Sequence, residues 1–318
     1  MIVILCPSNT TTGGAELMHQ IADSLNNMKV KNIILYRGQE NEESIQHFLS
    51  FYKFRYILDR SELNSFKISS VIVPETMVAE LDNFPKECRK IILWASINNY
   101  FRIKDTNSLF KNTLNIVKQL IGYNEISFLK LHKIEHLNQS YYAKKFLSSF
   151  GYKSLSIGDY LNESILYNAE KNQLEKENII LYNPKKGLAK SKSIIKYMDG
   201  FEFIPLINLS KPELINYLKR AKLYIDFGLH PGKDRIPREA ALYKCIVVTS
   251  KSGSANNDFD VKIPRKFKYG RFRTAKSVAR DLSYYVTNYS QIIGEFEDYR
   301  TSIKNEKAEF EKNLRKFF

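Results

Sequence analysis

The segment Ala221–Ser254 constrains the fold of this chain more than any other. Its apolar run Leu223–Phe227 predicts a buried strand, and the polar loop His230–Arg235 follows it. Pro237 suits the first turn of a helix, where its missing N–H costs nothing, and a second apolar run, Cys245–Val248, comes after that helix. Strand, loop, helix and strand in this order predict a parallel βαβ unit. Its polar loops lie at the carboxyl edge of the sheet, where open α/β sheets bind ligands.

The same alternation of apolar runs and helical patterns extends over most of the chain, which predicts an α/β protein with doubly wound parallel sheets. The polar stretch Asn162–Asn178 marks the boundary between two domains, residues 1–165 and 166–290. Residues 291–318 form a basic amphipathic helix, predicted over Ile292–Phe318. The strand-like runs are Met1–Cys6, Asn32–Tyr36, Ser70–Pro74, Lys90–Ser96, Ser127–His132, Ile179–Tyr182 and Phe201–Pro205.

Size and charge narrow the classes of protein. A chain of 318 residues with 43% hydrophobic and 26% charged residues suits two globular domains. The net charge of +15 divides into +4 for residues 1–150 and +11 for residues 151–318. Such an excess favours phosphate-bearing ligands, anionic membrane lipid or nucleic acid as partners. We expect no nucleic acid, because the sequence has no recognition motif and its aromatic residues do not interleave with a basic stripe.

The cysteines and the apolar runs bear on the compartment. Cys6, Cys88 and Cys245 form no motif, and two of them lie in or beside apolar runs, which indicates reduced thiols in a cytosolic protein. The apolar runs are too short to cross a membrane, and the first residues lack the basic leader of a signal peptide. We therefore expect a cytoplasmic protein, at most peripheral on the inner face of the membrane.

Cations gather after the predicted strands of the second half. Lys185 and Lys186 with Gly187 follow one strand, and the loop His230–Arg235 follows another at the same edge. Such cations could meet a diphosphate directly. Glu239, predicted in the first turn of the next helix, either gains from the helix dipole or accepts hydrogen bonds from ligand hydroxyls such as those of ribose. We favour the second interpretation, which predicts an anionic ligand that carries hydroxyls.

Two further patterns bear on phosphate and metal binding. Gly13 and Gly14 follow the first strand, where glycines let backbone N–H groups approach an anion. They do not form G-x-G-x-x-G, so a plain turn and a phosphate loop stay open and dinucleotide binding is not predicted. His132 and His136 lie four residues apart without a further ligand pattern, so no metal is predicted.

These residues carry a resemblance. The motif GGAE (Gly13–Glu16), the Lys-Lys-Gly loop and DFGLHPGKDRIPREAALYKCIVVTSKSGS (Asp226–Ser254) resemble the retaining GT-B glycosyltransferases of family 4 type. The segments His136–Asn162 and Asn178–Gly187 are similar to bacterial glycosyltransferases encoded with capsule or O-antigen clusters. The resemblance implies two Rossmann-like domains that face a central cleft. The C-terminal domain would hold a nucleotide-sugar donor, the N-terminal domain would face the acceptor, and the C-terminal helix would cross back.

The resemblance also assigns roles. Glu239 matches the second glutamate of the family's E-x7-E motif, which contacts the ribose. Lys186 with Gly187 matches the Lys-Gly that contacts the diphosphate, and Gly13 with Gly14 matches the N-terminal glycine loop.

The sequence departs from the family pattern at three places. Pro231 stands where the first glutamate of E-x7-E would be, and Leu181 where an arginine is frequent. The segment Ser96–Asn99 stands where a histidine is frequent. Asp234, Lys233 or Arg235 would have to replace the missing charges.

The predicted site follows from these assignments. The catalytic candidates are Lys186, Lys233, Asp234 and Arg235. The donor-binding candidates are Lys185, Asp226, Gly228, His230, Gly232, Pro237, Glu239, Ser252, Gly253 and Ser254. The candidates for the diphosphate and acceptor loop are Gly13, Gly14, Glu16, Ser96 and Asn98. No cofactor or metal is predicted.

The predicted function is transfer of a sugar from a nucleoside-diphosphate donor to a glycan or lipid-linked acceptor in surface polysaccharide biosynthesis. The resemblance implies retention of the anomeric configuration. Two alternatives stay open: a catalytically inactive homologue that binds nucleotide or glycan, and a nucleotide-sugar epimerase of the same fold.

Overall fold

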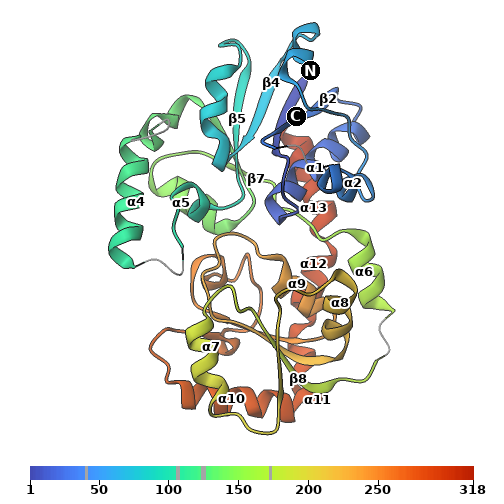
Figure 1. Cartoon of the computed structure of the whole chain (residues 1–318), viewed down its shortest axis with the longest axis vertical. Helices are drawn as coiled ribbons and strands as arrows, with labels where there is room; N and C mark the ends of the chain where they lie inside the picture. Colours follow the sequence, from blue (N-terminus) through green and yellow to red (C-terminus); the bar gives the residue numbers. More distant parts are fainter. Residues whose placement is uncertain (40–41, 105–107, 123–126, 172–173) are drawn as a thin grey trace. The chain divides into compact units, whose positions relative to one another are not determined.

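The computed structural model describes residues 1–39, 42–104, 108–122, 127–171 and 174–318. It divides into two compact units. Unit 1 comprises Met1–Asp159 with Ala308–Phe318, and unit 2 comprises Tyr160–Lys307. Each unit contains one β-sheet whose described strand pairs are all parallel (Figure 1). The predicted α/β class with two parallel-sheet domains is confirmed.

The sheet of unit 1 has the order β3-β2-β1-β4-β5-β6-β7. Because the order reverses between β1 and β4, the loops after β1, β4 and β5 leave neighbouring positions of one edge. The central strands are continuous apolar runs buried on both faces, as parallel strands covered by helices are. The strands are β1 (Ile2–Pro7), β2 (Asn32–Arg37), β3 (Tyr56–Ile57), β4 (Ser70–Pro74), β5 (Arg89–Trp94), β6 (Glu135–Asn138) and β7 (Leu155–Ser156).

One predicted strand of unit 1 is wrong. Ser127–His132 forms no strand, and Phe128–Lys133 is the 3₁₀ helix η3. Phe128 and Leu131 are both completely buried, and a 3₁₀ turn places residues three apart on one side. The other helices of unit 1 are α1 (Gly13–Asn27), α2 (Glu42–Leu49), η1 (Arg60–Ser65), η2 (Glu75–Asn83), α3 (Ile97–Tyr100), α4 (Leu109–Ile121) and α5 (Tyr141–Ser149).

The sheet of unit 2 has the order β12-β11-β10-β8-β9. The predicted βαβ unit is present, because β10 and β11 pair in parallel on either side of helix α9 in the chain. The strands are β8 (Glu177–Tyr182), β9 (Glu202–Pro205), β10 (Ala221–Asp226), β11 (Ile246–Ser250) and β12 (Lys268–Tyr269). The helices are α6 (Glu163–Glu170), α7 (Leu188–Ile195), α8 (Lys211–Arg220), α9 (Arg235–Leu242), η4 (Gly253–Asn256), η5 (Arg265–Phe267), α10 (Ala275–Thr287) and α11 (Tyr289–Ile292).

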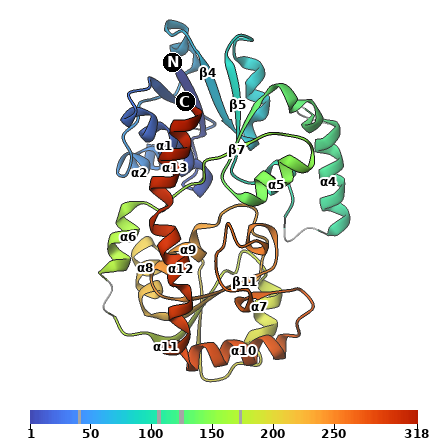
Figure 2. The same ribbon diagram turned by 180° about the vertical axis from the view of Figure 1, so that it is seen from behind.

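The C-terminal segment is not the single helix predicted over Ile292–Phe318. It is divided into η6 (Ile293–Phe296), α12 (Glu297–Lys304) and α13 (Glu306–Phe317). From Ala308 on, the chain belongs to unit 1, where it began, and both termini lie in that unit (Figure 2). The guanidinium of Arg89 lies 4.2 Å from the ring centroid of Phe317 and holds the last turn of α13 there.

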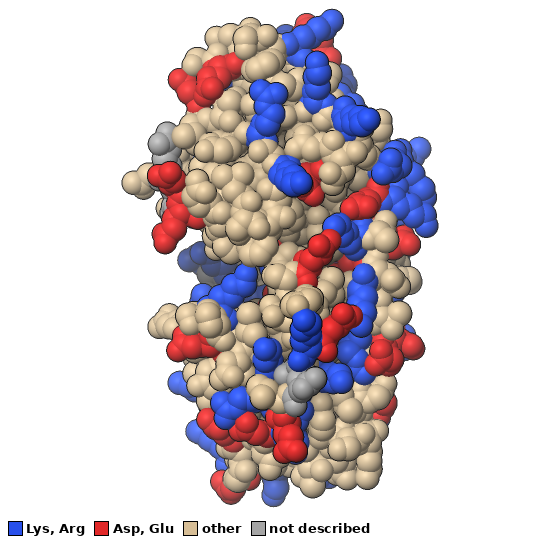
Figure 3. Space-filling model, turned by 90° about the vertical axis from the view of Figure 1, so that its right-hand side faces the viewer, with Lys and Arg blue, Asp and Glu red and all other residues tan. Residues whose placement is uncertain are grey.

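Two surface features concern possible partners. Among the described residues, no helix is both long enough and apolar enough to cross a membrane. On the face drawn in Figure 3, Lys and Arg side chains are interspersed with Asp and Glu. That face therefore offers no uninterrupted basic stripe to a polyanion.

Candidate functional site

The predicted donor-side residues lie on three loops at one edge of the unit 2 sheet. The strands β8, β10 and β11 are neighbours and run parallel. The loops that follow them, residues 183–187, 227–234 and 251–254, therefore emerge at the same carboxyl edge. The structure thus brings together the cationic loops that were predicted from the alternation of strands and helices.

Glycines let these loops touch through their backbones. Gly187 has a φ of +63°, and a Cβ atom there would lie 2.5 Å from the carbonyl carbon of Phe227. A Cβ atom on Gly228 would lie 2.1 Å from Cβ of Lys186. Gly253, with a φ of +52°, packs in the same way against the carbonyl oxygen of His230. A side chain at any of the three glycines would push the loops apart, so the glycines fix the position of Lys186.

The carboxylate of Asp226 anchors two of the loops. The residue is 1% exposed. Its Oδ1 accepts a hydrogen bond of 3.1 Å from the amide of Gly228, and its Oδ2 accepts bonds from the Tyr224 hydroxyl at 3.0 Å and the Asn183 side-chain amide at 3.2 Å. These partners all belong to the protein. The predicted donor contact thus has an internal, structural role here.

The serines of the third loop are also used inside the site. Ser252 donates a hydrogen bond of 2.8 Å to the carbonyl oxygen of Gly228, and Ser254 donates one of 2.5 Å to that of Gly232. Both hydroxyls therefore hold the loop of residues 227–234 in place.

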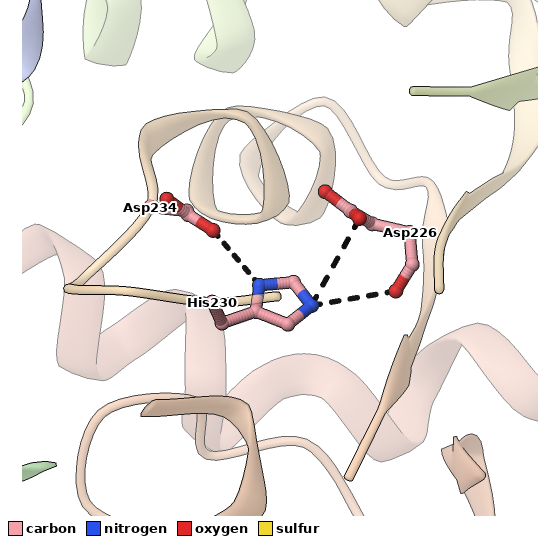
Figure 4. A group of neighbouring side chains, drawn as sticks. All are labelled: Asp226, His230 and Asp234. Carbon is pink, nitrogen blue, oxygen red and sulfur yellow. Dashed lines mark hydrogen bonds and ion pairs between the residues drawn. The ribbon is translucent and has the colours of Figure 1, made fainter. Parts of the chain in front are cut away.

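Asp234 is the centre of the charge arrangement. Its Oδ2 accepts a hydrogen bond of 2.9 Å from Nζ of Lys186. The same oxygen accepts one of 2.8 Å from Nδ1 of His230, which Figure 4 shows. His230 is completely buried, and its Nε2 faces the carbonyl oxygen of Asp226 at 3.3 Å. Both ring nitrogens thus face acceptors, which only the protonated ring can satisfy.

The pKa values agree with this arrangement. Burial lowers the pKa of His230, but the hydrogen bond to Asp234 and the charges of Asp226 and Asp234 outweigh it, so the pKa is raised. For Asp234, burial alone would raise the pKa. The hydrogen bond from His230 and the charge of Lys186 outweigh burial, and the pKa of Asp234 is lowered. Both shifts favour the charged forms, a carboxylate between two cations.

Helix α9 begins at this carboxylate. Asp234 is the N-cap residue, yet within the described part of the chain its side chain makes no hydrogen bond to the amides of α9. An N-cap aspartate ordinarily accepts one; here Lys186 and His230 take that place. The start of α9 keeps the positive end of the helix dipole, which favours an anion there. Pro237 lies in the first turn, as predicted.

Glu239 does not lie in the first turn of α9, where the sequence predicted it. The helix begins at Arg235, two residues earlier than expected, so Glu239 lies in the second turn. Its side chain is 10% exposed and its Oε1 lies 3.4 Å from a guanidinium nitrogen of Arg235, one turn away. The favourable effect of the helix dipole on a first-turn carboxylate therefore does not account for Glu239. Its carboxylate lies beside the guanidinium of Arg235.

Lys233 is directed elsewhere. Its Nζ lies 2.7 Å from Oε1 of Glu306, whose Oε2 is 2.7 Å from the guanidinium of Arg238. Arg238 is completely buried and also donates to the carbonyl oxygens of Lys233 and Asp234. These contacts fasten the end of the loop to α13. Of the four predicted catalytic residues, Lys186 and Asp234 are paired with each other, Arg235 with Glu239, and Lys233 with Glu306.

The structure also shows a group that could offer ligands to a metal. One ligand atom each of Asp226, His230 and Asp234 lies within 4.8 Å of the others. Their hydrogen bonds, however, are taken by the amide of Gly228 and by the ammonium of Lys186. An ammonium already lies where a metal would need the Asp234 oxygen, so this donor set suits protons and Lys186 better than a metal ion.

The predicted residues of the first half lie at the carboxyl edge of the unit 1 sheet. Gly13 and Gly14 are the first residues of α1, not part of a free loop, and Gly14 packs against Ala95. Glu16 is buried, and its Oε1 accepts a hydrogen bond of 2.7 Å from the Tyr52 hydroxyl. Its carboxylate is thus used inside the unit.

Ser96 and Asn98 hold the short helix after β5. The hydroxyl of Ser96 caps α3 by accepting a hydrogen bond from the amide of Asn99. Asn98 is buried, and its Oδ1 accepts a bond of 3.3 Å from the Tyr142 hydroxyl.

Three solved structures are similar over almost the whole chain. HepE from Anabaena, in complex with UDP-glucose, has a TM-score of 0.65 at 9% identity and covers 99% of this chain and 98% of its own. WaaG, a glycosyltransferase involved in lipopolysaccharide biosynthesis, has a TM-score of 0.62 at 10% identity, with 99% and 98% covered. The lipopolysaccharide outer core galactosyltransferase WaaB, in its apo form, has a TM-score of 0.62 at 10% identity, with 100% of both chains covered. The fold is GT-B.

Because only 9% or 10% of the residues are identical, the similarity to these three structures concerns the fold alone. No protein-family model matches the sequence, and no curated protein does.

Sequence reasoning missed three residues of this GT-B chain. Glu306 and Asn183 gave no signal, because their partners are distant in sequence. Glu75 follows β4 and is 2% exposed, and its Oε2 accepts a hydrogen bond of 2.9 Å from the amide of Ala95. Burial raises the pKa of Glu75 to about 7, although hydrogen bonds from backbone amides oppose the shift. An acidic residue directly after a buried strand was the available signal.

A separate pocket of unit 2 also gathers cations. It has a volume of about 600 Å³ and lies around β12 and α10. Its arginines and lysines are mostly paired: Asp281 binds Arg273 and Arg280, and Asp258 binds Arg265 and Lys268. Charge pairing therefore does not distinguish this pocket from the site beside α9, where Lys186 and Arg235 are also paired with carboxylates. The residues that line it are Lys251, Arg265, Lys266, Lys268, Tyr269, Gly270, Arg273, Arg280, Asp281, Tyr284 and Tyr285.

Proposed function

We propose that this protein is a glycosyltransferase that takes a sugar from a nucleoside-diphosphate donor. One observation carries the proposal: the contact of Gly187 with Phe227 and Gly228 holds the ammonium of Lys186 beside Asp234, the N-cap residue of α9. A cation next to a helix N-terminus suits a diphosphate. The GT-B fold supports the donor class, since the structure of HepE, which has this fold, is a complex with UDP-glucose.

The chemical demand of such a transfer is the departure of the diphosphate from a sugar that gains positive charge. Lys186 and Arg235 would neutralise the leaving phosphates together with the first amides of α9. Preorganised groups of this kind are worth roughly 3–4 kcal/mol each in a transition state. Asp234 and His230 are positioning residues, because they orient the ammonium of Lys186 and are themselves partly or fully buried.

Two further residues of unit 2 would contact the donor. Glu239 would accept hydrogen bonds from hydroxyls of the nucleoside, and the exposed Lys185 would add charge at the outer side of the loop. Because Lys186 already supplies a cation to Asp234, we propose that the reaction needs neither metal nor cofactor. Activity that persists in EDTA would agree with this.

We propose a glycan or lipid-linked acceptor, surface polysaccharide biosynthesis as the setting, and retention of configuration. Two proteins that share the fold support this setting. WaaG is a glycosyltransferase involved in lipopolysaccharide biosynthesis, and WaaB is a lipopolysaccharide outer core galactosyltransferase. The acceptor side would lie along Gly13, Gly14, Ser96 and Asn98 of unit 1. A cytoplasmic location is supported by the free, buried thiols of Cys6, Cys88 and Cys245.

One observation favours a second candidate. Pro231 has no carboxylate where the resembled family has the first glutamate of its motif, so the chain could bind a nucleotide sugar without turning it over. Nothing in the described geometry arranges acid and base groups around a sugar as an epimerase would need. The experiment below separates the transferase from the inactive homologue.

Calorimetric titration with UDP, GDP and CMP, followed by a donor-hydrolysis assay with the corresponding sugars, tests the proposal. We expect one nucleotide to bind. Lys186→Ala should weaken binding of the diphosphate and lower hydrolysis by about 100-fold or more. The control is Lys185→Ala, its exposed neighbour, which should change both by less than about tenfold.

Each result decides between the candidates. Binding without hydrolysis of the matching sugar nucleotide favours the inactive homologue. No binding of any nucleotide, or equal behaviour of Lys186→Ala and the parent, refutes the donor site. The anomeric configuration of a product, read by NMR, tests retention.

A further inference from the structure

Residues 261–280, which span η5, β12 and the start of α10, form the most basic segment of the chain. They contain eight lysines and arginines and no aspartate or glutamate. The segment therefore carries more than half of the net charge of +15. Its basic residues are Lys262, Arg265, Lys266, Lys268, Arg271, Arg273, Lys276 and Arg280.

This segment forms most of the separate pocket of unit 2, which is lined by Lys251 and by residues between 265 and 285 and which we call the β12–α10 pocket. Its inner wall consists of buried groups, among them Lys268, Tyr269 and Tyr285. The hydroxyls of the two tyrosines lie 3.2 Å apart, and the Tyr269 hydroxyl donates a hydrogen bond of 3.1 Å to Oδ2 of Asp281. The pocket is therefore a preformed part of the fold.

Positive charge stays in excess in the β12–α10 pocket after the ion pairs of the described residues are counted. Six lysines and arginines line it, and the three carboxylates that pair with them belong to Asp258, Asp281 and Glu295. These pairs reach the surface, since the side chains of Arg280 and Lys266 are 79% and 54% exposed. Exposed ion pairs are weak because water screens them. An anionic ligand could therefore take over these cations at little cost.

The surroundings of the cations suit a ligand that is more than a simple anion. Tyr284, in the lining, is 57% exposed. Phe272 follows β12 and is 86% exposed, with the guanidinium of Arg271 4.7 Å from its ring centroid. Exposed rings of this kind can pack on the apolar C–H face of a sugar, while the hydroxyl of Tyr284 stays in water. The volume of about 600 Å³ lies within the range of about 300–1,000 Å³ that is usual for small-molecule sites.

We propose that the β12–α10 pocket binds an anionic saccharide, which is a sugar or short oligosaccharide that carries carboxylate or phosphate groups. The excess of cations would hold the anionic groups through charge-assisted hydrogen bonds, and the exposed rings would hold the sugar. Single-stranded nucleic acid stacks successive bases on a series of rings. Among the described residues that line the pocket, Tyr284 is the one exposed ring, so a saccharide fits the pocket better.

The β12–α10 pocket is nearly separate from the proposed donor site. Of the described residues on the three donor-side loops, 183–187, 227–234 and 251–254, Lys251 alone lines it. Binding of a saccharide here therefore does not depend on the donor site, and the two can be tested apart.

The test is calorimetric titration of the full chain, without any sugar nucleotide, with trigalacturonate and mannose 6-phosphate. Maltotriose serves as the neutral saccharide and inorganic phosphate as the anion without a sugar. We expect both anionic saccharides to bind more tightly than either of these, and more weakly as salt rises. The double variant Lys266→Ala with Arg280→Ala should bind them at least about tenfold more weakly, because it removes two charged hydrogen-bond donors. Tyr284→Ala should weaken binding of the saccharides several-fold and leave that of inorganic phosphate unchanged.

A matched control is Lys262→Ala with Lys276→Ala, which removes the same charge from the same segment at two exposed residues outside the lining. This variant should bind like the parent, and so should Lys186→Ala, which separates the pocket from the proposed donor site. Circular dichroism should show that every variant is folded.

Three results would overturn the proposed saccharide site. The first is that the parent binds neither anionic saccharide. The second is an equal loss of affinity in the two double variants, which would mean attraction to the general charge of the segment. The third is tighter binding of inorganic phosphate or of a short oligothymidylate than of the saccharides, which would assign the pocket to a simple anion or to nucleic acid.

Discussion

The imidazole of His230 and the carboxylate of Asp234 form a hydrogen bond of 2.8 Å, with the histidine completely buried. Lys186 binds the same carboxylate oxygen from the other loop. Because Asp234 stands at the start of α9, the orientation of this one side chain decides where the ammonium of Lys186 lies relative to the first turn of the helix.

Replacement of His230 should make stability depend on pH in a defined direction. The folded pKa of His230 is raised above the ordinary value of 6.5. The stabilising charge is thus fully present below that value and is lost as pH rises through the folded pKa. We expect His230→Gln to lower the free energy of unfolding more at pH 5.5 than at pH 8.5, measured by urea titration. The exposed His132 supplies the control, His132→Gln, which should change the free energy of unfolding by less than about 0.5 kcal/mol. Parallel pH profiles for the parent and His230→Gln would contradict the proposed charge pair.

Gly228→Ala should destabilise unit 2. The new Cβ would lie 2.1 Å from Cβ of Lys186 and within 2.9 Å of its backbone, so the two loops must separate. We expect a loss of about 1–3 kcal/mol, the usual cost of overpacking, and weaker nucleotide binding because Lys186 moves. Differential scanning calorimetry measures the first effect. Gly294→Ala, where nothing lies within 4 Å, should leave the melting temperature unchanged or slightly raised. An unchanged melting temperature for Gly228→Ala would show that the loops do not need this contact.

Glu306→Ala should be costly for a different reason. It leaves the guanidinium of Arg238, which is completely buried, without its carboxylate partner. Breaking a buried ion pair from one side typically costs about 3–5 kcal/mol. Glu309 lies one turn further along α13 in an exposed pair with Lys312, so Glu309→Ala should cost less than about 1 kcal/mol. Chemical denaturation of both variants compares them, and equal costs would mean that Arg238 finds another partner.

Glu75 should make the protein less stable as pH rises from about 4.5 to 7. Its folded pKa is about 7 against an ordinary value of 4.5, so the folded state holds a proton that the unfolded state has lost. Stability therefore falls across this window and is constant above it. The loss is about 3 kcal/mol, since a tenfold change in proton affinity corresponds to about 1.4 kcal/mol. Glu75→Gln keeps an acceptor for the Ala95 amide and cannot ionise, so it should be more stable than the parent at pH 7.5 and similar at pH 4.5. If the difference in stability between Glu75→Gln and the parent were the same at both pH values, the titrating group would be another residue than Glu75.

Local patterns predicted the long central strands of both sheets and the carboxyl-edge loops, because apolar runs, Gly and Pro act over a few residues. They did not predict the short strands β3, β6, β7 and β12, whose few residues form no distinct apolar run. The same reasoning failed at η3, where Phe128 and Leu131 pack inward three residues apart. It also failed at the C-terminal segment, which is divided into η6, α12 and α13. In both places the local backbone conformation depends on what the segment packs against: a 3₁₀ helix in place of a strand at η3, and a divided helix in place of a continuous one at the C-terminus.

The sequence by itself determined the α/β class and the strand–loop–helix unit that carries the site, since hydrophobic periodicity and turn residues encode these locally. Only the tertiary structure decided which cation meets which carboxylate. Lys186 pairs with Asp234 because the glycine contacts bring distant loops together. Lys233 pairs with Glu306 because the start of α13 lies beside its loop. The tertiary structure also decided which face of α4 is covered, because apolar residues all round a helix do not say which side packs on the core.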